Sequence, residues 1–204
     1  MITGGTYPVR ELVQSYLDRA DYVVAADTGV ETALSYGVRP DLVVGDFDSL
    51  SDESLLEEFD AESVRRFGRA KDETDTEIAL RLVDEAGADH VVLVGGGGGR
   101  VDHLLGIASI FERDRHPDLW ITDVSAVRAL DDEAVEHGTI GETISFLPLG
   151  CEPCRMTSSG LRWPLDALTW GRGNAGLSNE FAEPVVRVRM RSGRLLVVRS
   201  AGSV

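Results

Sequence analysis

The sequence predicts an α/β protein in two lobes, and three observations lead to this prediction. Up to about residue 131, short apolar runs alternate with segments of helical periodicity, which is typical of a parallel sheet with crossover helices. Beyond that point the pattern changes to short runs that alternate with period two, which favours antiparallel strands. Ser192 and Gly193 separate the last two runs, as the turn of a hairpin would.

These patterns set the expected boundaries of the two lobes. We expect a parallel-sheet, Rossmann-like lobe over residues 1–131 and a linker over residues 132–140, where acidic residues and glycines gather. The smaller lobe, over residues 141–204, is expected to be an antiparallel β-sandwich or a barrel-like sheet.

Apolar runs and helical spacings predict the individual elements. Strands of the first lobe are expected at Tyr22–Ala26, Leu42–Gly45, His90–Val94 and Leu119–Val124. Helices are expected over Thr28–Tyr36, Ser51–Phe59 and Val101–Phe111, and a further one carries Ile78, Leu82 and Ala86 at a spacing of four, with Thr74 or Asp75 as its cap. Strands of the second lobe are expected at Thr143–Leu147, Val185–Met190 and Leu195–Arg199.

Composition excludes several classes of protein. The 204 residues are 43% hydrophobic and 27% charged, as in ordinary folded domains. A formal net charge of −15 opposes binding to nucleic acid or to an anionic membrane surface. The sequence has neither an apolar run of about 18 residues nor a signal peptide at Met1–Arg10, so we expect a cytoplasmic protein.

Lysine and cysteine are both rare. Lys71 is the only lysine among 20 lysine and arginine residues, and an acidic, lysine-poor chain suits a salt-rich cytoplasm, although a GC-rich genome would also favour arginine. Cys151 and Cys154 lack the second pair or the histidine that a zinc site requires, so two reduced thiols are expected.

Three segments carry residues suited to chemistry, and the first follows a buried strand. Asp46 and Asp48 come where the run Leu42–Gly45 enters a loop. Ligands of parallel sheets collect beyond the carboxyl ends of the strands, so paired carboxylates there suit a hard divalent cation. The alternative is that both are turn or cap residues, in which aspartate is common.

The second segment runs from Lys71 to Asp75. Thr74 and Asp75 would lie at a helix N-terminus, where exposed amides and the helix dipole favour a phosphate, and Lys71 supplies a mobile positive charge. The alternative is an ordinary capped amphipathic helix with a solvated acidic start.

The third segment is five consecutive glycines, Gly95–Gly99, followed by Arg100, Asp102 and His103. Glycines let the backbone approach an anion closely, and the amides at the following helix start suit a phosphate. The spacing does not match a dinucleotide fingerprint, and no lysine is placed to complete a Walker loop. Together the three segments indicate phosphoryl or diphosphoryl transfer at an unusual nucleotide site.

Six ordered motifs resemble those of the thiamine pyrophosphokinase family, over about residues 21–199. They are Ala25-Ala26-Asp27-Thr28-Gly29, Pro40-Asp41 with Gly45-Asp46-Phe47-Asp48-Ser49, Lys71-Asp72-x-Thr74-Asp75, Gly95-Gly96-x-Gly98-Gly99-Arg100-x-Asp102-His103, Ser159-Gly160-Leu161-Arg162-Trp163-Pro164-Leu165 and Gly176-Leu177-Ser178-Asn179-Glu180-Phe181. The chain departs from the family pattern at Thr28, Val30 and Glu31, where members usually carry glycines and an asparagine, and the family's first strand is expected within Met1–Gly4 if it is present.

The resemblance implies an enzyme that transfers the diphosphate of ATP to the thiamine hydroxyl. It implies that Mg²⁺ is held by Asp46, Asp48 and Asp75. It implies that ATP is bound by Asp27, Gly29, Lys71, Thr74, Gly96, Gly98, Gly99, Arg100, Asp102 and His103. It implies that thiamine contacts Trp163, Ser178 and Asn179, in a homodimer whose active site lies between the α/β lobe of one subunit and the β lobe of the other.

Two alternative functions remain open at this level. One is a diphosphokinase for another heteroaromatic alcohol, such as a hydroxymethylpterin, which the segments around Trp163 and Ser178 disfavour. The other is a non-catalytic sensor of a nucleotide or thiamine, which has no need for three acidic metal ligands. The residue that accepts the hydroxyl proton is not assigned.

Overall fold

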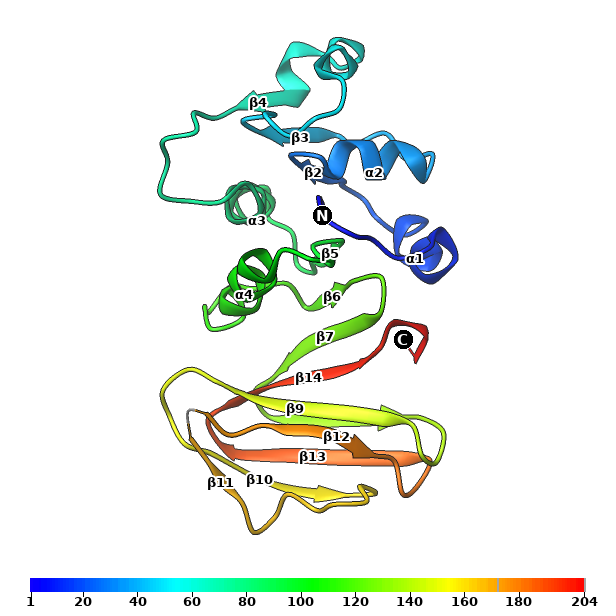
Figure 1. The fold of residues 1–204 in the computed structure, drawn as a ribbon, viewed down its shortest axis with the longest axis vertical. Helices are drawn as coiled ribbons and strands as arrows, with labels where there is room; N and C mark the ends of the chain where they lie inside the picture. Colours follow the sequence, from blue (N-terminus) through cyan, green and yellow to red (C-terminus); the bar gives the residue numbers. More distant parts are fainter. Residues whose placement is uncertain (172, 204) are drawn as a thin grey trace. The chain divides into compact units, whose positions relative to one another are not determined.

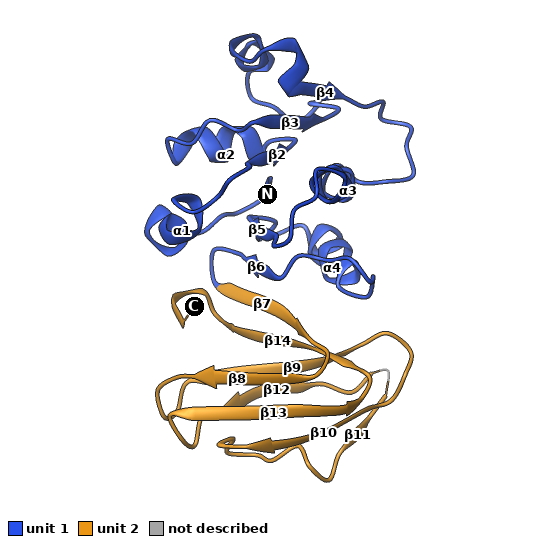
Figure 2. Cartoon of the chain, turned by 180° about the vertical axis from the view of Figure 1, so that it is seen from behind, with its two compact units in different colours: residues 1–124 blue, residues 125–204 orange. Residues whose placement is uncertain are grey.

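The computed structural model describes residues 1–171 and 173–203, and it divides the chain into two compact units, Met1–Val124 and Ser125–Val204 (Figure 2). This division falls before the segment 132–140, where a linker was expected. That segment contains β8 (Glu133–His137), which pairs antiparallel with β13 (Val185–Ser192) and buries alternate residues. The run Glu133–His137 is short and mostly charged, so its period-two pattern is hidden in the sequence.

Unit 1 holds a parallel sheet whose strands follow the order β6-β5-β1-β2-β3-β4. The strands are β1 (Ile2–Thr3), β2 (Val24–Ala26), β3 (Leu42–Gly45), β4 (Val64–Arg66), β5 (Val92–Val94) and β6 (Leu119–Ile121). The helices are α1 (Arg10–Leu17), α2 (Gly29–Ser35), α3 (Asp75–Glu85) and α4 (Val101–Ile110), with short 3-10 helices at η1 (Glu53–Glu58) and η2 (Ala61–Ser63). Figure 1 shows α1 and α2 on one face of this sheet and α3 and α4 on the other.

Alternation along the strands supplies a separate core to each face of the sheet. Val24 and Ala26 of β2 pack with α3, whereas Ala25 between them packs with Val30 of α2 and Leu56 of η1. The strands are therefore apolar on both sides, which is why they appear in the sequence as continuous apolar runs.

One helix differs from its sequence prediction, and at another the structure decides between two alternatives that the sequence left open. The segment expected as a helix at Ser51–Phe59 is a 3-10 helix, which begins where the Asp52 side chain accepts a hydrogen bond from the Ser54 amide at 2.9 Å. At α3 the cap is Thr74 and not Asp75, because Thr74 and Glu77 form a reciprocal capping box.

The two-residue strand β1 lies in the middle of the sheet, between β2 and β5. The first strand is therefore present within Met1–Gly4, and it is central. Helix α2 begins directly against it: a Cβ on Gly29 would lie 2.2 Å from the carbonyl oxygen of Ile2. Only glycine allows this approach.

Unit 2 consists of antiparallel strands in two groups, β12-β9-β14-β7 and β11-β10-β13-β8. Besides β8 and β13, the strands are β7 (Ser125–Leu130), β9 (Thr143–Leu149), β10 (Cys154–Ser159), β11 (Thr169–Trp170), β12 (Gly176–Glu180) and β14 (Arg194–Ser200), and a 3-10 helix, η3 (Ala201–Ser203), follows. Both groups contribute to one apolar core, in which Phe146 of β9 and Leu195 of β14 gather with Met156 of β10 and Val188 of β13.

Two further expectations concern the cysteines and membrane association. Cys151 is exposed and Cys154 is buried in the unit 2 core, and the structure contains no disulfide between them. Burial raises the pKa of the Cys154 thiol, against the opposing bonds from nearby main chain. Within residues 1–171 and 173–203, none of the helices has the length and hydropathy needed to span a membrane.

Candidate active site

Acidic side chains gather beyond the carboxyl ends of β2 and β3. Asp27 follows β2, Asp46 follows β3, and Asp75 is the first residue of α3. Neighbouring parallel strands end at the same edge of a sheet, so their following loops meet there. The main chain ties two of these loops together, because the Asp27 amide donates to the Val44 carbonyl at 2.8 Å.

Lys71 joins two of the three predicted metal ligands. Its ammonium nitrogen lies 2.7 Å from Asp75 Oδ1 and 3.6 Å from Asp46 Oδ2, and all three side chains are about one-fifth exposed or less. Burial alone would lower the pKa of Lys71, but its bonds and charge interactions with Asp75 and Asp46 raise it. Lys71 is therefore a fixed positive charge between the two carboxylates.

Asp48 has different partners. It accepts a hydrogen bond from the Ser49 hydroxyl at 2.9 Å and pairs with the guanidinium of Arg69 at 3.2 Å. Its amide donates to Asp46 Oδ1 at 3.3 Å, which makes a tight turn of the Asp46–Asp48 segment. In the part of the chain that the structure describes, no three Asp, Glu, His or Cys side chains are grouped closely enough to hold a metal ion.

The charges of this cluster act on one another. Burial would raise the pKa of Asp46, but the Asp48 amide and the positive charges of Lys71 and Arg69 hold it below its usual range. The pKa of Asp27 is raised by its burial, and the carboxylates of Asp75, Asp46 and Asp48 raise it further, although the Thr28 amide opposes this. The charges of Asp75, Asp46 and Asp48 therefore all act on Asp27, and the four carboxylates lie in one region.

Asp27 is also strained and incompletely bonded. Its φ of 48° lies in the left-handed region, which costs a non-glycine residue energy, and its Oδ1 atom is buried without a hydrogen-bond partner. Such features gather at functional sites because an ordinary core position would not retain them.

Asp27→Asn is expected to raise the melting temperature of the metal-free protein at neutral pH by a few degrees. The change removes a half-buried charge that three carboxylates repel and that has one buried oxygen, Oδ1, without a hydrogen-bond partner. Since the folded-state pKa of Asp27 is raised, its destabilising effect appears as pH rises through that pKa and is absent below the ordinary aspartate pKa. Thermal melts in EDTA across this pH range measure the difference.

Asp41→Asn provides the matched control of opposite sign. Asp41 Oδ2 accepts a hydrogen bond from the Val23 amide at 2.7 Å, so loss of its charge weakens an existing bond and lowers the melting temperature. A melting temperature of Asp27→Asn at or below that of the wild type at neutral pH contradicts the prediction.

The glycine-rich loop after β5 is held by main-chain bonds. The amides of Gly95, Gly96 and Gly97 donate to the carbonyls of Ile121, Gly4 and Thr6 at 2.8–3.1 Å. These three amides therefore support the loop itself, and any amide that contacts an anion comes from further along it. Gly98 has φ 99° and lies against Thr6, whereas a Cβ on Gly99 would meet nothing within 4 Å, so the loop offers an open approach at Gly99.

The start of α4 carries the remaining predicted nucleotide residues. Arg100 donates to both carboxylate oxygens of Asp102, at 2.9 and 2.6 Å, and this pairing lowers the pKa of Asp102. Both side chains are largely exposed, and His103 is exposed beside them. The structure thus places Arg100, Asp102 and His103 together at one helix N-terminus.

Structural roles explain three predicted nucleotide-binding residues without reference to a ligand. Thr74 caps α3, and Gly29 permits the contact between α2 and β1. Gly96 has φ 72°, and a Cβ on it would lie 2.3 Å from Ile107 Cδ1, so its lack of a side chain serves packing as well.

In unit 2 the predicted thiamine residues lie in two paired segments. The Arg162 amide donates to the Glu180 carbonyl at 2.9 Å, which brings Trp163 beside Asn179. Trp163 is 51% exposed, whereas Asn179 is 5% exposed and hydrogen bonds to the main chain of Trp163. Ser178 is exposed and has φ 57°.

The sequence interpretation missed Arg69 and Ser145. Arg69 pairs with Asp48, and its position two residues before Lys71 was an available signal. Ser145 accepts a hydrogen bond from the Ser178 amide at 3.0 Å across two strands, which no local pattern reveals.

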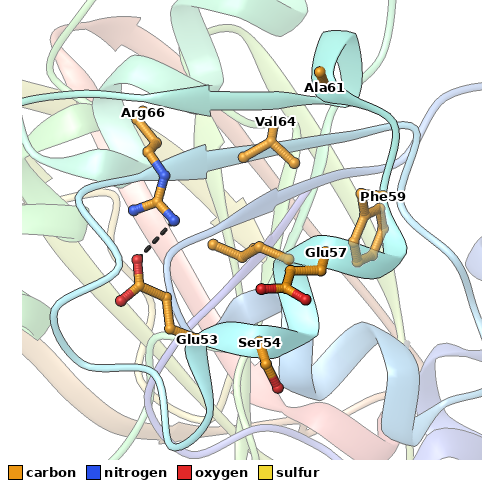
Figure 3. A pocket seen from close by; sticks show the side chains of 8 residues that line it. Glu53, Ser54, Glu57, Phe59, Ala61, Val64 and Arg66 are labelled. Carbon is orange, nitrogen blue, oxygen red and sulfur yellow. Dashed lines mark ion pairs between the residues drawn. The ribbon is translucent and has the colours of Figure 1, made fainter.

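A separate pocket of about 460 Å³ lies in unit 1 between η1 and β4 (Figure 3). Its walls include Leu56, Phe59 and Val64, and Arg66 and Glu53 form an ion pair at 2.6 Å (Figure 3). It is lined by none of the residues that the sequence assigned to the site.

Two family models match separate parts of the chain. Residues 13–122 match the family "Thiamin pyrophosphokinase, catalytic domain", and residues 133–195 match "Thiamin pyrophosphokinase, vitamin B1 binding domain". Thiamine pyrophosphokinase of Bacillus subtilis (strain 168) is 25% identical over 207 residues, which cover 98% of this chain and 97% of that protein.

Solved structures share the fold over almost the whole chain. A thiamine pyrophosphokinase from Bacillus subtilis superposes with a TM-score of 0.82 at 24% identity, covering 98% of this chain and 97% of the other. A thiamin pyrophosphokinase from Geobacillus thermodenitrificans gives 0.76 at 28% identity, with 98% and 95% covered. Since the catalytic-domain match alone spans more than half of the residues, the chain belongs to the thiamin pyrophosphokinase family.

Proposed function

We propose that this chain is a thiamine pyrophosphokinase, which transfers the diphosphate group of ATP to the hydroxyl group of thiamine. The thiamine hydroxyl group gives its proton to a base, its oxygen forms a bond to the β-phosphorus, the bond between that phosphorus and the oxygen of the α-phosphate breaks, and AMP leaves. The observation that carries the proposal is the acidic cluster around Lys71, at the carboxyl ends of β2 and β3 in a chain of this family. We also propose the finer fold assignment, in which a Rossmann-like lobe is followed by a sandwich-like lobe.

The donors of the acidic cluster are of the kind that Mg²⁺ prefers, but among the described residues no three of them are grouped closely enough to hold the ion, so its binding requires these side chains to move together. Four carboxylates, from Asp27, Asp46, Asp48 and Asp75, share the region with the cations Lys71 and Arg69, and hard divalent cations prefer carboxylate oxygens. We propose that Asp46, Asp48 and Asp75 hold the ion. When bound, Mg²⁺ neutralises charge on the phosphate oxygens.

The other side chains position the two substrates. Lys71 and Arg100 supply positive charge for the phosphates of ATP, together with the amides around Gly98 and Gly99 and the N-termini of α3 and α4. Asp27, Asp102 and His103 complete the nucleotide side. The exposed indole of Trp163 suits the cationic thiazolium ring of thiamine, and the neighbouring Ser178 suits its polar pyrimidine.

One assay separates this function from its rivals. The protein is incubated with ATP, Mg²⁺ and either thiamine or a hydroxymethylpterin, and AMP and the diphosphate ester are measured. AMP with thiamine diphosphate is the expected result. Product from the pterin alone identifies the other diphosphokinase, and tight thiamine binding without AMP identifies a sensor.

We also propose a homodimer in which the acids of one subunit act with Trp163 of its partner, as the family resemblance implies. At a thiamine concentration near the wild-type KM, Asp46→Asn and Trp163→Ala are each expected to have little activity alone. Subunits exchanged between them should recover about a quarter of wild-type activity, because half of the dimers are mixed and each holds one intact site. Failure to recover activity in mixtures shown by mass spectrometry to contain heterodimers contradicts the shared site.

Two further parts of the proposal concern the protein's setting. A cytoplasmic location and adaptation to salt are both compatible with the net charge of −15 and the single lysine. Adaptation to salt predicts that the melting temperature rises from low to molar KCl. A melting temperature that does not change with KCl would contradict adaptation to salt.

A further inference from the structure

We infer that Asn179 is a positioning residue, whose side chain fixes the main chain of Trp163 so that its indole is presented to thiamine. The inference rests on the proposed function for the identity of the ligand. Its geometric part rests only on contacts within unit 2. It assigns Asn179 a task different from the direct thiamine contact that the family resemblance implies.

The side-chain amide of Asn179 forms hydrogen bonds through both its oxygen and its nitrogen. Its Oδ1 accepts hydrogen bonds from the Trp163 amide at 3.2 Å and the Glu180 amide at 2.8 Å, and its Nδ2 donates to the Trp163 carbonyl at 2.8 Å. The side chain therefore satisfies both main-chain polar groups of Trp163, as a neighbouring strand would. At 5% exposure, Asn179 leaves almost no surface for a ligand.

A β-bulge in β12 turns Asn179 toward Trp163. The pairing of β12 with β9 shifts register between Gly176 and Asn179, and Ser178 in this interval has φ 57°. Leu177 and Ser178 are consequently exposed in succession and Asn179 is buried, whereas a regular strand would alternate. Ser145 Oγ supports the bulge by accepting the Ser178 amide hydrogen at 3.0 Å.

Trp163 is the exposed tryptophan of three. Trp120 and Trp170 are 5% and 7% exposed, against 51% for Trp163, so its large apolar ring is held near solvent. The Arg162 guanidinium lies over the ring at 5.0 Å from the centroid and is anchored by Glu180 at 2.6 Å. A ring held in this way can stack on a ligand with little loss of conformational freedom.

Asn179→Ala is expected to raise the KM for thiamine about tenfold, because the bonds that fix Trp163 are lost, with little change in kcat or in the KM for ATP. In protein labelled with 5-fluorotryptophan, the ¹⁹F resonance of Trp163, assigned through Trp163→Phe, should shift or broaden. Asn174→Ala is the matched control, because Asn174 also accepts a main-chain hydrogen bond, from Gly171 at 2.9 Å, but does not contact Trp163. It should leave both measurements unchanged.

A double-mutant cycle separates positioning from direct contact. In a Trp163→Ala background, Asn179→Ala should change thiamine affinity by less than about twofold, because its effect acts through the missing indole. A second tenfold loss in that background would show that Asn179 contacts thiamine itself and would overturn the inference, as would an unchanged ¹⁹F resonance.

Asn179→Asp serves if the alanine variant does not fold. It keeps the acceptor for two amides, but its second oxygen repels the Trp163 carbonyl oxygen instead of donating to it, so a raised KM and a shifted ¹⁹F resonance are again expected. If the wild-type protein does not convert thiamine, the proposed function fails. The ¹⁹F comparison would still decide whether Asn179 fixes Trp163.

Discussion

Asp46→Asn and Asp75→Asn are each expected to lower turnover by about two to four orders of magnitude. Each change removes a carboxylate that the proposed mechanism uses to hold Mg²⁺ on the phosphates, and it leaves Lys71 with one fewer acidic partner. Release of AMP in single-turnover experiments measures the loss directly. We expect the KM for thiamine to change much less than kcat.

The fold should survive both substitutions. Asp46 and Asp75 are partly exposed, so loss of their ion pairs with Lys71 is expected to reduce the free energy of unfolding by no more than about 1 kcal/mol. Asp89→Asn, at an exposed position of unit 1, is the control and should retain wild-type turnover. Wild-type rates in either site variant would refute the metal-binding role of that residue.

Arg199→Met is expected to lower the free energy of unfolding by about 3–5 kcal/mol. The Arg199 side chain is 6% exposed and pairs with Glu136 at 2.9 Å and Glu142 at 2.6 Å, and its guanidinium lies 5.0 Å from the centre of the Phe181 ring. Its removal leaves the buried Glu136 with Arg128 as its remaining cationic partner. Urea denaturation with an unchanged m-value would measure this loss.

Part of this cost arises because the buried Glu136 loses one of its two cationic partners, and a second substitution tests that cause. Combining Arg199→Met with Glu136→Met removes both members of this buried pair and should recover part of the lost stability, although Arg128 then loses its pairing with Glu136. Arg189→Met, at an exposed position of β13, should change stability by less than about 0.5 kcal/mol. A double variant as unstable as Arg199→Met would point to lost packing.

Most of unit 1 could be predicted because its elements carry local signals. The runs that became β3 and β5 are apolar on both faces, and α3 has both a capping box and an apolar stripe. The short strand β1 carries almost no periodicity, and its central place comes from pairing with β2 and β5, which lie far along the chain. Helix α1 was missed because only Val13 in it is buried.

The candidate site likewise contains residues that the sequence could predict and a contact that it could not. Asp46 and Asp75 were predictable because strand ends and helix starts can be located from the sequence, and their meeting follows from sheet topology. The hydrogen bonds between Asn179 and Trp163 could not be predicted. They depend on a bulge and on a left-handed Ser178, and both exist only once β12 pairs with β9. Cross-strand register is a property of tertiary structure.

The bonded amides of the glycine-rich loop have a consequence for ligand binding. Five successive glycines would ordinarily form a flexible segment, which loses much conformational entropy when a bound nucleotide orders it. Here the amides of Gly95, Gly96 and Gly97 already have acceptors in the loops after β1 and in β6. Much of this entropy is therefore lost during folding, so under the proposed function a phosphate would meet a preorganised loop and would lose little affinity in ordering it.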